Sequence, residues 1–333
     1  MNNFKKVGIS ALAGSLAMFS VNADIVLSGS SEFTYSSNSG STGGASAVTG
    51  NPFGMSHDIN ITGSGELDNG FTYSVNTNFA GQDMATDSSI LKLDMGDLGT
   101  LGFDQGSGAF GISTLENKVP TAYEEADHGV GSLGHGIDAA GNTNVIGYSN
   151  TVGGVGVSLQ INPSAKAAAS ALNEAGAGAN TVKTGSNWNI ALTSAVAGID
   201  GLSLAAGYSE TDNIGTVTDN EEMTAAINYT MGAVSVGYQQ SVVDNKGGST
   251  GAEVTTYGIA FNVNENLSLS YSINDNEKTN AGAAHVTEES KGYQAAYSMG
   301  SASVRLAINS ADNVGGVTDK NADNTELSLA LAF

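Results

Sequence analysis

The sequence has 333 residues, with 33 acidic side chains against 11 basic ones, and it contains no cysteine. Charged residues make up 13% of the chain, about half of the ~25% that is usual in soluble domains. The lack of cysteine excludes disulfides, thiol nucleophiles and cysteine-bound metals, and the shortage of basic residues argues against a nucleic-acid partner, whose phosphates need a basic surface.

Residues 1–23 have the layout of a secretory signal peptide. Two lysines precede an apolar stretch at residues 7–19, and small residues follow up to Ala23. Cleavage is therefore expected between Ala23 and Asp24, which leaves residues 24–333 as the mature chain. A short membrane anchor or a buried helix is the alternative. It is disfavoured because the apolar stretch is shorter than the ~20 residues that a membrane-spanning helix needs.

Strands with two different faces are predicted along the mature chain. Residues 71–79 (FTYSVNTNF), 267–274 (LSLSYSIN) and 325–333 (TELSLALAF) alternate large apolar side chains with small or polar ones. Because successive side chains of a strand point to opposite sides, each segment has one apolar and one polar face. The mature chain has no continuous apolar span, so it is not expected to cross a membrane as a helix.

The predicted connections between strands alternate between short and long. Short turns are expected at 68–70, 96–99, 151–154, 198–201, 231–233, 264–266 and 299–301. Longer polar loops are expected at 37–54, 80–87, 106–142, 163–186, 211–220, 244–252, 275–287 and 311–324. This alternation predicts an all-β fold, a transmembrane antiparallel β-barrel of about 16 strands with short periplasmic turns and long external loops.

The polar face of the strands indicates a water-filled interior. In hydrocarbon every backbone N–H and C=O must be paired within the protein, so strands cross a membrane only as a closed barrel. Buried polar groups without partners would each cost a few kcal/mol, and a barrel of this size is too wide for side chains to fill. We therefore expect a channel for passive diffusion of ions and small hydrophilic solutes. The alternative is a secreted β-rich adhesin or surface-layer protein without channel activity.

Several segments together resemble a known family. Residues 96–106 (GDLGTLGFDQG), the hairpin at 144–161 (NVIGYSNTVGGVGVSLQI) and the terminal strand ending in Phe333 resemble the Gram-negative general-diffusion porins, especially the sixteen-stranded alphaproteobacterial kind. The resemblance covers the whole mature chain. Each motif is loose by itself, and the order of the motifs carries the resemblance.

The resemblance implies a homotrimer in the outer membrane, in contact with lipid and lipopolysaccharide. It implies that the loop at 106–142 folds inward and narrows the pore. It also implies that Phe333 is the insertion signal read by the outer-membrane assembly machinery, as well as a lipid-facing strand end. The sequence departs from the family pattern at Asp104, where a basic residue is common, and at Asn150-Thr151, where Ser-Pro is usual.

The expected pore is rich in carboxylates. The candidate constriction loop carries Glu116, Lys118, Glu124, Glu125, Asp127 and Asp138, and strand parity turns Lys92, Asp94, Asp104 and Arg305 toward the pore. Arg305 is the only arginine of the chain. Since a unit charge at about 4 Å in water contributes ~1 kcal/mol, a few unbalanced acids are expected to favour cations about tenfold. The alternative is that these acids lie on the solvated loop exterior or bind divalent cations, which leaves the pore weakly selective.

No cofactor is expected, although weak divalent-cation binding by the acidic loops is compatible with the sequence. Residues 319–323 begin like a calcium loop, but Asn324 replaces the required glycine. The four histidines are too scattered to predict a metal site. The hydrolase motifs with known spacing do not occur, which argues against an enzyme.

Overall fold

The computed structural model describes residues 24–42, 45–46, 50–81, 83–130, 137, 143–163, 186–212, 219–245, 250–280 and 286–333. The expected signal peptide lies outside the described residues, so its cleavage between Ala23 and Asp24 stays a prediction. The expected pore acid Asp138 also lies outside them.

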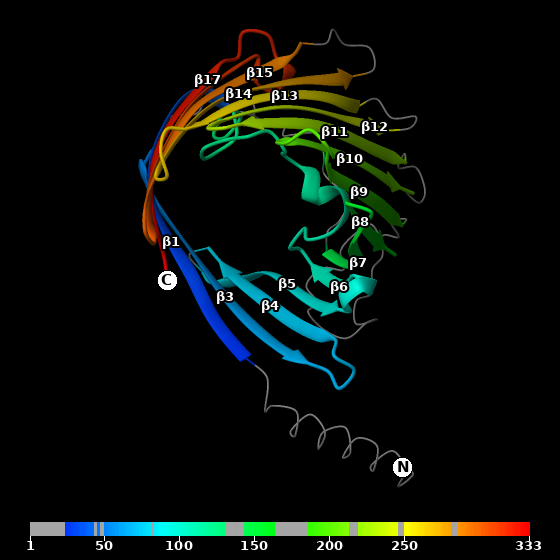
Figure 1. Ribbon diagram of the computed structural model, residues 1–333. Coiled ribbons are helices and arrows are strands. Elements are labelled where there is room, and N and C mark those ends of the chain that lie inside the picture. Colours follow the sequence, from blue (N-terminus) through cyan, green and yellow to red (C-terminus); the bar gives the residue numbers. More distant parts are fainter. Residues whose placement is uncertain are drawn as a thin grey trace, which may run out of the picture.

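The described strands form one antiparallel sheet that closes on itself (Figure 1). In chain order they are β1 (Asp24–Thr42), β2 (Ala45–Ser46), β3 (Phe53–Glu66), β4 (Thr72–Ala80), β5 (Ala85–Asp94), β6 (Thr100–Gln105), β7 (Thr143–Val152), β8 (Val155–Asn162), β9 (Asn187–Ala195), β10 (Leu202–Thr211), β11 (Asn220–Met231), β12 (Val234–Asn245), β13 (Thr250–Asn262), β14 (Leu267–Asn280), β15 (Glu288–Met299), β16 (Ala302–Asp312) and β17 (Ala322–Ala332). β2 has two residues and pairs with the end of β1. The other sixteen strands form the barrel wall, which confirms the predicted fold class.

The remaining regular elements of the described chain are short 3-10 segments. They are η2 (Gly96–Leu98), η3 (Gly111–Leu115) and η4 (Val314–Gly316). Among the described residues, no helix has both the length and the apolar character that crossing a membrane requires.

The barrel closes where β1 pairs with both β3 and β17. Ser30 lies opposite Asp58 on one side and Ala332 on the other. Past the end of β17, the N–H of Gly29 donates to the carbonyl of Phe333 at 3.0 Å, and the N–H of Phe333 donates to the carbonyl of Gly29 at 2.9 Å. This closure pairs the first and last strands, so their backbone groups are not left open to hydrocarbon.

The connections are short at one end of the barrel, as predicted. Gly153 and Gly154 join β7 to β8, and their φ angles of 60° and 85° are readily adopted by glycine. At the other end the strands run further than expected. β4 ends at Ala80 and β5 begins at Ala85, so half of the loop expected at 80–87 is strand. The apolar alternation ends there because the side chains on both faces are small or polar. The backbone hydrogen bonds between the two strands continue beyond that point.

The wall has its polar side chains inside and its apolar side chains outside. Ser328 and Asn189 are buried, whereas Leu329 and Ile259 are exposed on the outer surface. The cross-strand register keeps each type on one face, since Ser328 pairs with Arg305 while Leu329 pairs with Val304. This arrangement suits a wall with hydrocarbon on one side and water on the other.

Candidate pore constriction

The segment that joins β6 to β7, residues 106–142, is the lumenal loop, and its described part lies inside the ring of strands (Figure 1). Near the start of this loop, the ring of Phe110 packs against Gly102 of β6 and Gly147 of β7. These two glycines are cross-strand partners. Their missing side chains leave a bare patch of wall on which the ring lies, and Phe110 is fully buried there.

Polar side chains of the next strands hold the backbone of η3. The N–H of Gly111 donates to Ser158 Oγ of β8 at 2.8 Å, and the N–H of Ile112 donates to Asn189 Oδ1 of β9 at 3.0 Å. Ile112 also packs over Gly207 of β10. The first turn of the lumenal loop is thereby fixed to three successive strands.

The middle of the lumenal loop is held by two amide side chains. Gln239 of β12 donates from Nε2 to the carbonyl of Leu115 at 2.7 Å, and its Oε1 accepts the N–H of Lys118 at 2.6 Å. Asn228 of β11 donates to the carbonyl of Lys118 at 2.7 Å. These bonds satisfy backbone groups that would otherwise be unpaired against the wall.

The last described part of the loop reaches β14 and β16. The N–H of Ala122 donates to Ser270 Oγ at 2.8 Å, and Asn309 Nδ2 donates to the carbonyls of Glu125 and His128 at 3.2 and 2.9 Å. The described contacts of the loop thus follow the inner wall strand by strand from β8 toward β17. The loop narrows the lumen from that side, and β3–β5 form the facing wall.

A network of charged side chains lies where the loop meets β16, β17 and β1. Tyr123 Oη lies 2.7 Å from Glu326 Oε1 and 2.9 Å from Glu32 Oε1. Arg305 Nη2 lies 2.6 Å from the same oxygen of Glu32 and donates to Ser328 Oγ at 2.9 Å. The guanidinium carbon of Arg305 is 4.4 Å from the centre of the Tyr123 ring, a cation–π contact.

His128 of the loop lies between two carboxylates. Its Nδ1 is 3.4 Å from Glu124 Oε2, and its Nε2 is 3.5 Å from Glu326 Oε2. The hydrogen bond with Glu326 raises the pKa of His128, against the lowering that burial causes. Burial raises the pKa of Glu124, and burial together with the hydrogen bond to Glu326 raises the pKa of Tyr123.

Part of the facing wall is lined by neutral polar side chains. Asn78 of β4 donates to Asn60 of β3 at 3.2 Å, and Asn76 donates to Thr62 at 2.8 Å. These four side chains pair across the wall, which gives the lumen amide and hydroxyl groups there in place of charges.

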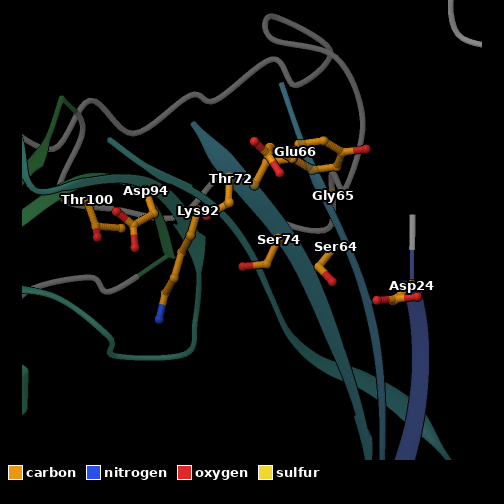
Figure 2. A pocket seen from close by; sticks show the side chains of 10 residues that line it. Asp24, Ser64, Gly65, Glu66, Thr72, Ser74, Lys92, Asp94 and Thr100 are labelled. Carbon is orange, nitrogen blue, oxygen red and sulfur yellow. The ribbon is translucent and has the colours of Figure 1, made fainter. Parts of the chain in front are cut away.

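A recess of about 690 Å³ lies near the short-turn end of this wall. Figure 2 shows Lys92 there with the carboxylates of Asp24, Glu66 and Asp94. The other residues that line it include Ser64, Thr72, Ser74 and Thr100. Lys92 is the one cation among the residues that line this recess, against three acids.

Asp104 lies on the inner side of β6, where the start of the lumenal loop covers it. It is fully buried, and its two carboxylate oxygens accept the N–H groups of Ser107 at 2.8 Å and Ala109 at 3.0 Å. Asp104 therefore fixes the start of the lumenal loop and presents no open charge. The sequence held a local signal for this role, because Asp104 is followed by Gln-Gly-Ser-Gly and an Asp near such a turn commonly accepts backbone N–H groups.

The other predicted residues occupy several environments. Glu116 is exposed, and Lys118, Glu125 and Asp127 are half-buried along the loop. Glu124 contacts one nitrogen of the His128 ring, and Glu326 contacts the other. Sequence reasoning missed Glu326 and Glu32, which point inward from β17 and β1. Strand parity carried that signal, since Glu326 alternates with the apolar residues of the terminal strand.

Comparison with known proteins agrees with this architecture. A family model described as Gram-negative porin matches residues 9–332. The chain is similar to OmpT, an outer membrane protein of Vibrio cholerae, with a TM-score of 0.66, 12% identity and coverage of 93% of this chain and 98% of that chain. It is also similar to the anion-selective porin from Comamonas acidovorans, with a TM-score of 0.65, 14% identity and coverage of 93% and 100%. No curated protein matches the sequence.

Proposed function

This chain belongs to the Gram-negative porin family and is an outer-membrane channel with no enzymatic activity, and we propose that the channel favours cations over anions. Because the chain belongs to a family of channels, the alternative of a secreted adhesin without a channel is rejected. The proposed cargo is ions and small hydrophilic solutes, which diffuse passively through the lumen.

The observation that carries the proposed selectivity is the position of Arg305. The only arginine of the chain lies 2.6 Å from Glu32, so its positive charge is offset by a carboxylate of the neighbouring wall. Glu326 and Glu124 lie close by and add negative charge, while the facing wall offers Asn and Thr side chains. Acids in excess at a narrow, water-filled passage raise the local concentration of cations.

Of the described lysines, Lys92 and Lys118 lie beside the lumenal loop, and neither builds a basic wall. Lys92 lines a recess that also holds three carboxylates, and its Nζ lies 5.9 Å from the centre of the Phe110 ring. Lys118 is half-buried on the loop, with its backbone bonded to Gln239 and Asn228. The similar fold of a porin named as anion-selective indicates that the sign of selectivity depends on such side chains and not on the barrel.

Liposome swelling with charged solutes of similar size tests this proposal. We expect liposomes that contain the purified protein to swell faster in lysine hydrochloride than in sodium glutamate, because the organic cation meets an attractive lumen. Equal rates, or a faster rate with glutamate, would contradict the proposal. A neutral solute such as glycine reports the open pore in the same preparation.

We also propose a homotrimer that contacts lipid and lipopolysaccharide. Chemical cross-linking in detergent tests the trimer, and finding only monomers after cross-linking would contradict it.

We further propose that the outer-membrane assembly machinery recognises Phe333. Its backbone pairs with Gly29 at the seam of the barrel and its ring is exposed. Phe333→Ala is expected to lower the amount of assembled barrel in the outer membrane while the purified chain still folds in detergent.

A further inference from the structure

We propose that Glu124, His128 and Glu326 form a binding site for a divalent transition-metal ion such as Zn²⁺. One donor atom from each of the three residues lies within 4.8 Å of the donor atoms of the other two. Glu124 and His128 are four residues apart on the lumenal loop, whereas Glu326 is on β17, 198 positions after His128. An ion at this place would connect the far end of the loop to the barrel wall.

Neighbouring groups hold two of the donors in place. Asn309 donates to the carbonyls of Glu125 and His128, which fixes the turn that carries the imidazole. Tyr123 lies 2.7 Å from Glu326 Oε1, which leaves Glu326 Oε2 directed at His128 Nε2, 3.5 Å away. Hydrogen bonds of this kind hold metal ligands in the orientation that binding requires.

The third donor is the half-exposed carboxylate of Glu124. Glu124 now faces Nδ1 of the ring, whereas Glu326 faces Nε2. A single ion bound to Nε2 and to Glu326 is completed when the half-exposed side chain of Glu124 turns around the edge of the ring. Three protein ligands and one water give the four-coordinate arrangement that Zn²⁺ accepts.

The chemistry of the donors favours a transition metal over Ca²⁺ or Mg²⁺. An imidazole nitrogen suits Zn²⁺, Cu²⁺ or Ni²⁺, while Ca²⁺ takes six to eight oxygens and Mg²⁺ a full octahedron of them. Two carboxylates and a neutral imidazole supply two negative charges for a doubly charged ion. The guanidinium of Arg305 makes its short contacts with Glu32 and Ser328.

Calorimetric titration of the purified full-length protein in detergent with ZnCl₂ tests the proposal. We expect one Zn²⁺ per chain for the unmodified protein and for Glu116→Gln, a matched control that removes an exposed acid of the same loop outside the cluster. In His128→Gln the affinity should fall at least tenfold. Tyr123→Phe should weaken binding less, because it removes only the group that orients Glu326. Excess Mg²⁺ should not displace the ion.

Two results would overturn the site: no Zn²⁺ binding by the unmodified protein, or equal binding by His128→Gln. Glu326 is buried, so its substitution risks the fold, and Glu124→Gln on the half-exposed loop is the second ligand variant. Heat-dependent mobility on gels verifies that each variant is a folded barrel. The titration measures binding and not ion flow, so its outcome is independent of whether the pore prefers cations.

Discussion

The ring of Phe110 occupies the space that a side chain at Gly147 would need. A Cβ at Gly147 would lie 2.0 Å from Phe110 Cγ, and one at Gly102 would lie 2.4 Å from the same ring. Since Gly102 and Gly147 pair across β6 and β7, the ring rests on two adjacent stretches of bare backbone. The lumenal loop is therefore anchored at its start by a contact that only glycine permits.

Gly147→Val is expected to displace Phe110 and to destabilise the barrel by about 1–3 kcal/mol, because the extra methyl groups overfill a packed site. The temperature at which the folded band disappears on heat-modifiability gels should fall, and single-channel currents should become noisier as the loop loses its anchor. Gly63→Val is the matched control, since a Cβ there has no neighbour within 4 Å. Equal losses in the two variants would show that the contact with Phe110 has no special weight.

Asp104→Asn is expected to weaken the start of the lumenal loop. The buried carboxylate accepts two backbone N–H groups, and the amide that replaces it keeps only one acceptor atom. Losing one hydrogen bond to a charged acceptor costs about 1.5–3 kcal/mol, so thermal stability should fall. Asp94→Asn removes an exposed acid of the preceding strand β5, whose single backbone hydrogen bond the amide oxygen can still accept, and should leave stability within error. Unchanged stability in Asp104→Asn would rule out the proposed anchoring role.

The barrel could be predicted from the sequence because successive side chains of each strand alternate between two different environments. Residues 325–333 and 267–274 alternate strictly, since one face of each strand meets hydrocarbon and the other meets water. The strand ends could not be predicted in the same way. β14 continues to Asn280 and β1 to Thr42, in segments where polar residues occupy both faces and only the backbone ladder persists.

The site was predicted less well than the fold, for a different reason. The path of the lumenal loop depends on contacts such as Lys118 with Gln239, which are 121 residues apart and leave no trace in local spacing. Arg305 was expected to face the pore, but its pairing with Glu32 depends on the seam between β17 and β1. The histidines looked scattered in the sequence, and the fold brings His128 to Glu326.

Arg305→Gln is expected to raise the preference of the channel for cations. Removing the guanidinium leaves Glu32 and Glu326 without their neighbouring positive charge, and a charge at about 4 Å in water contributes ~1 kcal/mol, which corresponds to about a fivefold change. The ratio of K⁺ to Cl⁻ permeability should increase by up to that factor in a salt gradient. Lys291→Gln is the control, because Lys291 lies opposite Ile273 in the strand register, on the outer face of the barrel. A ratio that falls in Arg305→Gln would contradict the expected direction.

The reversal potential of the purified protein in a planar bilayer, with a gradient of KCl across it, is the most direct test of the proposed cation preference. Acids in excess around the lumenal loop and an arginine bound to Glu32 predict the sign of potential that K⁺ movement down its gradient produces. Raising the salt concentration should reduce that potential, since mobile ions screen the lumenal charges. A potential of the opposite sign, set by Cl⁻, would contradict the proposal.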